Sequence, residues 1–136
     1  MNIILAAALA ALCLFVPPSS VNATAQEANA TPAMKEFWSK FQRAVAKNDR
    51  EAVAALTKFP LAMPYGVPGI KTRAQLAKRY GEIFDAETKK CFATARPQVE
   101  DAKAKKFSIH CGEAMMYWFE FSGGTYKFAS VDNINE

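Results

Sequence analysis

An aromatic hairpin signal in residues 114–131 (AMMYWFEFSGGTYKFASV) constrains the fold more than any other part of the sequence. A Gly-Gly pair between two alternating apolar runs favours a two-residue turn, because both central residues of a type I′ turn need a positive φ. A turn at Gly123-Gly124 sets two aromatic pairs and one oppositely charged pair across the strands, each worth roughly 0.2–1 kcal/mol. The predicted pairs are Phe121–Tyr126, Glu120–Lys127 and Phe119–Phe128.

Both faces of this predicted hairpin are apolar, because side chains alternate across a strand. One face carries Tyr117, Phe119, Phe121, Tyr126 and Phe128. The other carries Met116, Trp118, Ala129 and Val131. We expect helices to cover one face, and more chain, a partner subunit or a ligand to cover the other.

Residues 1–23 have the features of a secretory signal. Residues 3–16 form an apolar run that suits an h-region and is too short to span a bilayer, and Val21-Asn22-Ala23 suits signal cleavage. No Lys or Arg precedes the run, so a permanent N-terminal anchor is the alternative. Residues 24–32 are polar and rich in alanine, and we expect a flexible leader there. The predicted location is secreted or periplasmic, without membrane attachment after cleavage.

Length and charge restrict the functional classes. The chain has 136 residues, enough for one domain, which is predicted over 33–134. Its 17 Lys and Arg residues against 13 Asp and Glu give a net charge of +4, and none of these residues lies in 1–23. The basic residues are dispersed and are not interleaved with aromatics, so nucleic-acid binding has no support.

Three helices are predicted before the hairpin, each opened by a capping side chain. Apolar residues at i, i+3, i+4, i+7 and i+11 indicate the first of them. This stripe comprises Met34, Phe37, Trp38, Phe41 and Val45. The predicted ranges and caps are 32–47 with Thr31, 50–57 with Asp49 and 73–84 with Thr72.

Four strands are predicted after the helices, over residues 91–98, 106–111, 114–121 and 125–131. Pro60 limits residues 58–63 to an edge strand or a loop. A hairpin centred near Asp101 sets Cys91 opposite Cys111 and gathers the apolar residues of both strands on one face. We therefore predict a Cys91–Cys111 disulfide, with two free thiols as the alternative.

The next turn decides which side of the sheet the helices cover. A turn at Gly112-Glu113 sets Ile109 opposite Met116 and Phe107 opposite Trp118. We expect the helices on that side, and the face with Tyr117 on the opposite side.

This order of elements resembles the nuclear-transport-factor-2-like superfamily, also called cystatin-like α+β. Residues 41–57 (FQRAVAKNDREAVAALT) look like the family's opening of a long helix, an Asp and a second helix, and residues 69–84 resemble its third helix. The resemblance covers about residues 34–132. It implies an α+β fold with three N-terminal helices packed on a curved antiparallel sheet of four or more strands. The resulting cone often holds a pocket.

Dimers of this superfamily often pair through the outer face of the sheet. The resemblance therefore implies a homodimer here. The predicted interface comprises Tyr117, Phe119, Phe121, Tyr126 and Phe128.

Few residues suggest catalysis. Enzymes of the superfamily usually place a His, an Asp or a Tyr–Asp set in the cone, whereas His110 shares a face with Ser108 away from the predicted cone. Asp132, near the cone mouth, is the best single candidate, and a charge at a strand end is the simpler interpretation. With one His and no thiolate cluster, we predict no catalytic residue, no metal and no cofactor.

Trp38, Tyr80 and Trp118 are predicted to line a ligand pocket, with core packing as the alternative. Three functional classes remain. The first is an exported non-catalytic domain that binds a small apolar ligand or a protein partner. The second is an isomerase, dehydratase or hydrolase built in the cone, and the third is a secreted inhibitor or immunity-like protein that acts through the sheet face. We favour the first.

Overall fold

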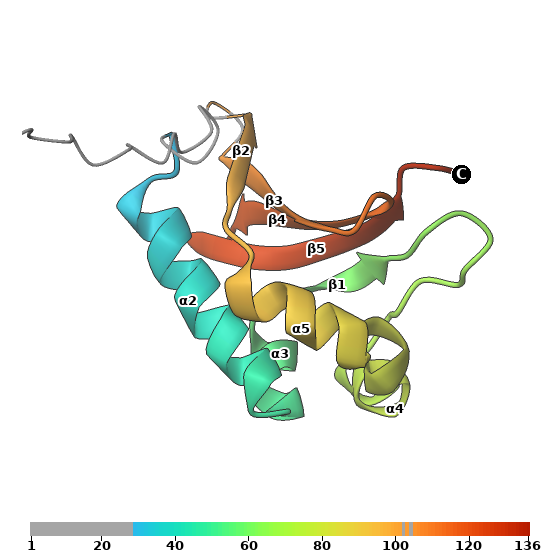
Figure 1. Ribbon diagram of the computed structural model, residues 1–136. Coiled ribbons are helices and arrows are strands. Elements are labelled where there is room, and N and C mark those ends of the chain that lie inside the picture. The colour runs from blue at the N-terminus through green and yellow to red at the C-terminus, as the bar shows by residue number, and fades with distance from the viewer. Residues whose placement is uncertain (1–28, 102, 104) are drawn as a thin grey trace, which may run out of the picture.

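The computed structural model describes residues 29–101, 103 and 105–136. Its helices and strands follow in the order α2 (Pro32–Ala46), α3 (Arg50–Ala55), β1 (Thr57–Ala62), α4 (Arg73–Ile83), α5 (Ala86–Thr94), β2 (Gln98–Asp101), β3 (Lys106–Cys111), β4 (Met115–Ser122) and β5 (Thr125–Asn133) (Figure 1). The predicted signal peptide over 1–23, and the leader as far as residue 28, lie outside the described residues.

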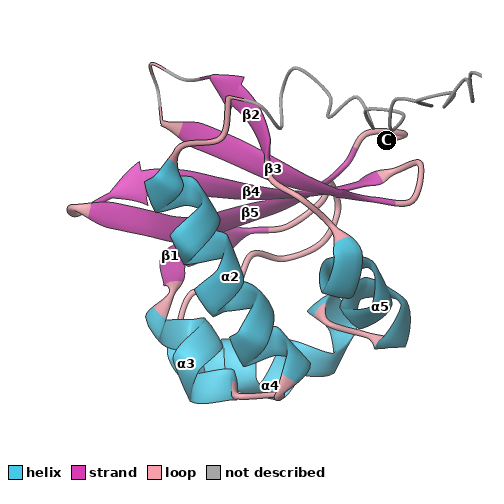
Figure 2. Ribbon diagram, turned by 60° about the vertical axis from the view of Figure 1, so that its left-hand side comes forward, coloured by secondary structure: helices cyan, strands magenta, loops and turns pink. Residues whose placement is uncertain are grey.

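The strands form one mixed sheet in the order β1-β5-β4-β3-β2. β1 runs parallel to β5, and the other neighbouring strands are antiparallel. The sheet, predicted as antiparallel with four or more strands, is therefore five-stranded and mixed, and residues 57–62 take an edge position that tolerates Pro60. Figure 2 shows the helices together on one side of this sheet, so the α+β class is confirmed.

The three predicted helices and their caps are confirmed. The side-chain oxygens of Thr31, Asp49 and Thr72 each accept a hydrogen bond from the backbone N–H three residues further on, at 3.1–3.2 Å. Each bond satisfies one of the donors that a helix start leaves free. The first helix, α2, buries the whole of its predicted apolar stripe, together with Ala44.

A fourth helix, α5, takes up the first half of the segment 91–98 where the sequence predicts a strand. The carboxylate of Asp85 caps it by accepting a hydrogen bond from the Thr88 N–H at 2.8 Å. Thr88 and Phe92, spaced i and i+4, are the buried residues of this helix. The local alternation of apolar and polar residues also suits a strand, which is why the strand prediction over 91–98 is wrong. Of the predicted segment, only its end at Gln98 pairs with β3.

The turn between β3 and β4 is one residue longer than predicted. Cys111 pairs with Met115, and Ile109 pairs with Tyr117 rather than with Met116. Because side chains alternate along a strand, this single residue reverses every side chain of β4 relative to β3. The predicted outer face of β4 is therefore its inner face.

The predicted sheet-face interface is wrong for four of its five residues. The helices of the same chain cover Tyr117 (2 % exposed), Phe119 (0 %), Tyr126 (4 %) and Phe128 (0 %). Phe121, at the end of β4, is 40 % exposed. A homodimer stays a prediction, without those four side chains as its contact surface.

A β-bulge in β5 determines which face of the sheet the last residues of this strand occupy. The predicted hairpin register is confirmed over the four pairs nearest the turn. Beyond them, Trp118 pairs with Ser130 rather than with Ala129, so β5 holds one extra residue. The bulge pairs Val131 with Tyr117, and both are buried on the helix side.

Aromatic rings fill the space between the helices and the sheet. The ring of Phe41, on α2, lies 5.1 Å from that of Phe119 and 5.3 Å from that of Phe128, measured between centroids. Phe92 of α5 lies 5.1 Å from Trp38. Such pairs add about 0.5–1.5 kcal/mol to the burial of their apolar area. The deep part of the cone is therefore packed core.

The two faces of β4 give a direct test of this arrangement. Replacing Phe119 by Ala should lower the free energy of unfolding by about 3–5 kcal/mol, because it empties a site in the core. Replacing Phe121 by Ala on the same strand should lower it by about 1 kcal/mol or less. Urea unfolding of both variants measures the difference. Equal losses would contradict the orientation of β4.

Candidate functional site

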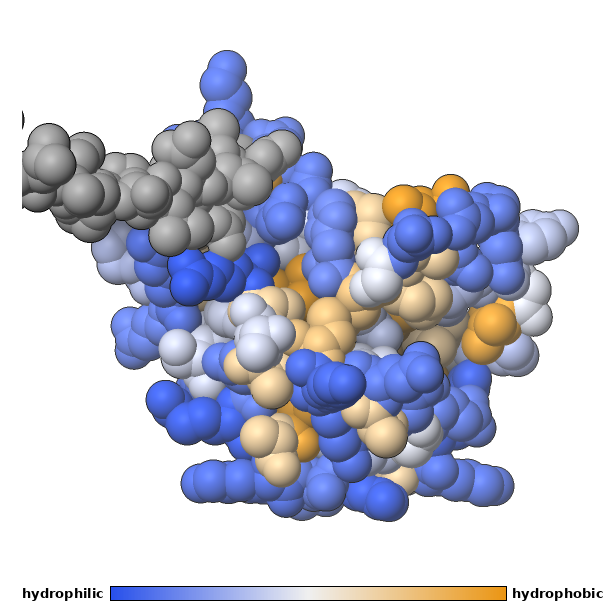
Figure 3. All heavy atoms as spheres, viewed as in Figure 1, coloured by the Kyte–Doolittle hydropathy of each residue, from blue (hydrophilic) through white to orange (hydrophobic). Residues whose placement is uncertain are grey.

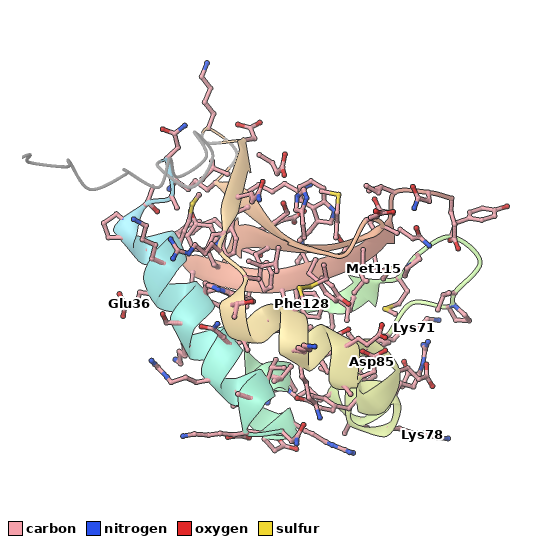
Figure 4. The ribbon with its side chains drawn as sticks, viewed as in Figure 1. Glu36, Lys71, Lys78, Asp85, Met115 and Phe128 are labelled. Carbon is pink, nitrogen blue, oxygen red and sulfur yellow. A yellow bond between two sulfur atoms is a disulfide. The ribbon has the colours of Figure 1, made fainter. Side chains whose placement is uncertain are left out.

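A cavity of about 470 Å³ opens at the mouth of the cone, where α4 and α5 approach the β3–β4 turn and the segment after β1. Figure 4 shows Met115 and Asp85 in this region, and Figure 3 shows apolar surface over α5 framed by hydrophilic side chains. The apolar part of the wall includes Met63, Ile83, Met115, Tyr117 and Val131. The charged residues among the lining are Arg79, Glu82, Asp85 and Glu87.

The first turn of α5 supplies the polar part of this wall. Asp85 caps the helix start, and Glu87 and Thr88 lie in the first turn after it. Cys91 lies one turn after both, so the three residues share one face of the helix. The cap therefore determines which side chains of α5 reach the cavity.

A buried pair of hydroxyl groups joins α5 to the sheet. The Tyr117 hydroxyl lies 3.1 Å from Thr88 Oγ1, and the Thr88 backbone N–H donates to the Asp85 carboxylate at 2.8 Å. Tyr117 is positioned by β4, and its ring packs edge-on against Phe92 with centroids 4.9 Å apart. Tyr117, Thr88 and Asp85 thus form a hydrogen-bonded row from the wall of the cavity to its rim.

The row holds its two end groups in defined charge states. Burial raises the pKa of the Tyr117 phenol above its usual value of 10.0; the Thr88 hydrogen bond opposes this shift and the Asp85 charge adds to it. The hydrogen bond from the Thr88 backbone lowers the pKa of the Asp85 carboxyl, and the Thr88 side chain adds to that effect. At neutral pH the phenol is therefore protonated and the carboxylate is charged.

The predicted disulfide is confirmed, but it joins a helix to a strand. Cys91 of α5 is bonded to Cys111 of β3, and both residues line the cavity. Their Cα atoms are 5.7 Å apart, a separation that a helix lying on a strand provides as well as a hairpin does. The bond holds the middle of α5 against the sheet beside the Tyr117–Thr88 pair.

Arg79 is the lining residue with a permanent positive charge, and two of its nitrogens donate hydrogen bonds within the chain. Its Nε bonds to Glu82 Oε2 at 3.0 Å and its Nη1 to the carbonyl of Pro68 at 2.8 Å. Among the described residues, neither Asp85 nor Glu87 forms an ion pair with a Lys or an Arg.

The three residues predicted to line a ligand pocket lie apart. Trp38 and Tyr80 are buried (4 % and 2 % exposed). The indole N–H of Trp38 donates to the Ala95 carbonyl at 3.0 Å, and Trp38 borders a second cleft, of about 680 Å³, between α2 and residues 93–97. The Tyr80 hydroxyl has no hydrogen-bond partner in the described part of the chain. Trp118 lies on the other side of the sheet, under the Lys106 ammonium at 4.4 Å.

His110 and Ser108 share the outer face of β3, as predicted. His110 Nε2 lies 2.8 Å from Ser108 Oγ, which donates to Glu100 Oε1 at 2.8 Å. Ser108 is 0 % exposed, so its hydroxyl is closed to a substrate. Asp132 is exposed and paired with Met116 in register, away from the cavity lining. Across residues 29–101, 103 and 105–136, no three His, Cys, Asp or Glu residues could hold a metal.

Sequence reasoning missed the role of the Tyr117–Thr88–Asp85 row. The predicted two-residue turn sets Tyr117 on the outer face, and no helix is predicted to begin at Asp85. The signal that could have found α5 is Asp85 itself with Glu87 in the first turn, because Asp is a preferred helix cap and acidic residues favour a helix start. No helix in the described part of the chain is long and apolar enough to cross a membrane.

Removing the disulfide should destabilise the fold. The bond closes a loop with a sequence separation of 20 residues, and the chain-entropy model gives such a bond about 3 kcal/mol. Urea unfolding of the double variant Cys91→Ser, Cys111→Ser should show this loss, and reduced wild-type protein should match the variant. A loss below about 1 kcal/mol would argue against the bond.

The buried phenol predicts a stability that falls at alkaline pH. The folded state keeps the Tyr117 proton where the unfolded state releases it, so the free energy of unfolding decreases as the pH rises above about 10. Tyr80 and Tyr126 also have raised pKa values, chiefly through burial, and contribute in the same direction.

Replacing Tyr117 by Phe should lower the stability by about 1 kcal/mol at pH 8. It should also reduce the further loss between pH 8 and pH 11, as measured by urea unfolding at each pH. An alkaline loss as large as that of the wild type would show that Tyr117 is not the buried group.

Comparisons with known proteins find similarity among solved structures. No family model and no curated protein matches the sequence. Among solved structures, the chain is similar to an NTF2-like protein with a cystatin-like fold from Novosphingobium aromaticivorans. The identity is 15 %, the TM-score is 0.43, and the match covers 74 % of this chain and 78 % of that one.

Proposed function

We propose that this chain is an exported, non-catalytic domain that binds a small, mostly apolar molecule in the cavity at the cone mouth. The observation that carries the proposal is an apolar-walled cavity of about 470 Å³ with a buried hydroxyl pair in its wall. Ligand sites typically have volumes of about 300–1,000 Å³, apolar walls and a few placed polar groups. The Tyr117–Thr88 pair provides the polar group that orients a ligand.

The charge states of the polar row favour binding over acid–base catalysis. A general acid or base works best with a pKa near the working pH. Burial moves the Tyr117 pKa further above neutrality, and the helix-cap hydrogen bonds move the Asp85 pKa further below it. The Tyr117 phenol therefore keeps its proton and the Asp85 carboxylate keeps its charge near neutral pH, which suits a binding site whose polar groups do not titrate.

The Cys91–Cys111 disulfide supports export. Disulfides form and persist in oxidising compartments such as the periplasm or the extracellular space. The signal-like composition of residues 1–23 points to the same location.

Filling the cavity tests the proposal. The neutral fluorescent probe N-phenyl-1-naphthylamine should gain fluorescence on binding the wild-type protein. Replacing Met115 by Trp, at the mouth, should weaken that binding at least about tenfold, because the larger side chain occupies the ligand's space.

A matched variant fills the other cleft. Replacing Ser39 by Trp, on α2 at the second cleft, should leave probe affinity within about twofold of the wild type. The proposal would be wrong if the probe does not bind, or if Ser39→Trp weakens binding and Met115→Trp does not. Circular dichroism of both variants checks that they fold.

A further inference from the structure

The cavity is acidic although the chain is basic. Its charged lining residues are three carboxylates and one guanidinium, whereas the whole chain has a net charge of +4. Glu82 is paired with Arg79 at 3.0 Å. Asp85 and Glu87 remain as carboxylates without an ion pair in the described part of the chain. The mouth therefore presents an excess of about two negative charges to a bound molecule.

Together these features define a ligand class, and we propose that the cavity binds a cationic amphiphile: an apolar body that carries a protonated amine. The inference rests on the proposed function, because it concerns the same cavity. The apolar body lies against Met63, Met115 and Val131. The ammonium lies near Tyr117 with Asp85 and Glu87 as counter-charges. An ammonium group carries the charge opposite to that of these carboxylates and can donate hydrogen bonds to them. A carboxylate ligand would meet like charges.

Three probes with one apolar body separate charge from apolar contact. They are 4-phenylbutylamine, 4-phenylbutan-1-ol and 4-phenylbutanoate, which are cationic, neutral and anionic at pH 7. Their affinities and positions are measured by NMR titration of the oxidised protein, from the shifts of residues that line the cavity. The amine should bind about tenfold more tightly than the alcohol, as expected for two partly exposed carboxylates, and the butanoate should bind most weakly.

Neutralising the two carboxylates should remove the advantage of the amine. In the double variant Asp85→Asn, Glu87→Gln, the amine and the alcohol should bind within about twofold of each other. Asn is also a good helix cap, so α5 should remain formed. The control Glu36→Gln, Glu51→Gln makes the same change of net charge on α2 and α3, away from the cavity lining, and should keep the tenfold ratio.

The outcomes distinguish this inference from the proposed function. Equal binding of the amine and the alcohol at the cavity would overturn the cationic ligand and leave an apolar ligand site. Tightest binding of the butanoate would overturn it in the same way. Binding of none of the three at the cavity would contradict both proposals.

Discussion

The packing of Tyr117 against α5 is the contact on which the rest of the structure depends. It requires the β4 side chains at positions 117 and 119 to face the helices, and it places Thr88 within 3.1 Å of the phenol. It also closes one side of the cone, because α5 lies on the sheet through Phe92 and through the Cys91–Cys111 bond. Without this contact the cavity would lose its wall.

Local signals in the sequence were sufficient where the residue chemistry allows one backbone geometry. Gly123-Gly124 has positive φ at both residues, and the hairpin register beside it is as predicted. Thr31, Asp49 and Thr72 cap the helices that their positions predict. Pro60 confines its strand to an edge of the sheet. In each case one or two side chains determine the outcome within a few residues.

Predictions that depend on longer-range contacts were less successful. Cys91 and Cys111 can meet across a hairpin or between a helix and a strand, so the correct disulfide supported a wrong strand. The turn after Cys111 has three residues rather than the predicted two, so the side chains of β4 face the opposite way from the prediction. Both faces of β4 carry apolar residues, so the hydrophobic pattern does not distinguish the two registers. The candidate site is the part that the sequence predicts least well. Its polar row joins Asp85 and Thr88 of one segment to Tyr117 of another, and only the fold brings these segments together.

The consequence for function is that most aromatic side chains belong to the core. The groups proposed to contact a ligand, among them Asp85 and Glu87, lie in the wall of the cavity. The most direct test is a nuclear Overhauser measurement on the oxidised protein. The packing of Tyr117 against α5 predicts strong cross-peaks from the Tyr117 ring to the Thr88 methyl group and to the Phe92 ring. The centroids of the two rings are 4.9 Å apart. Cross-peaks from Trp118 to Phe92, with none from Tyr117, would place the opposite face of β4 under α5 and contradict the account.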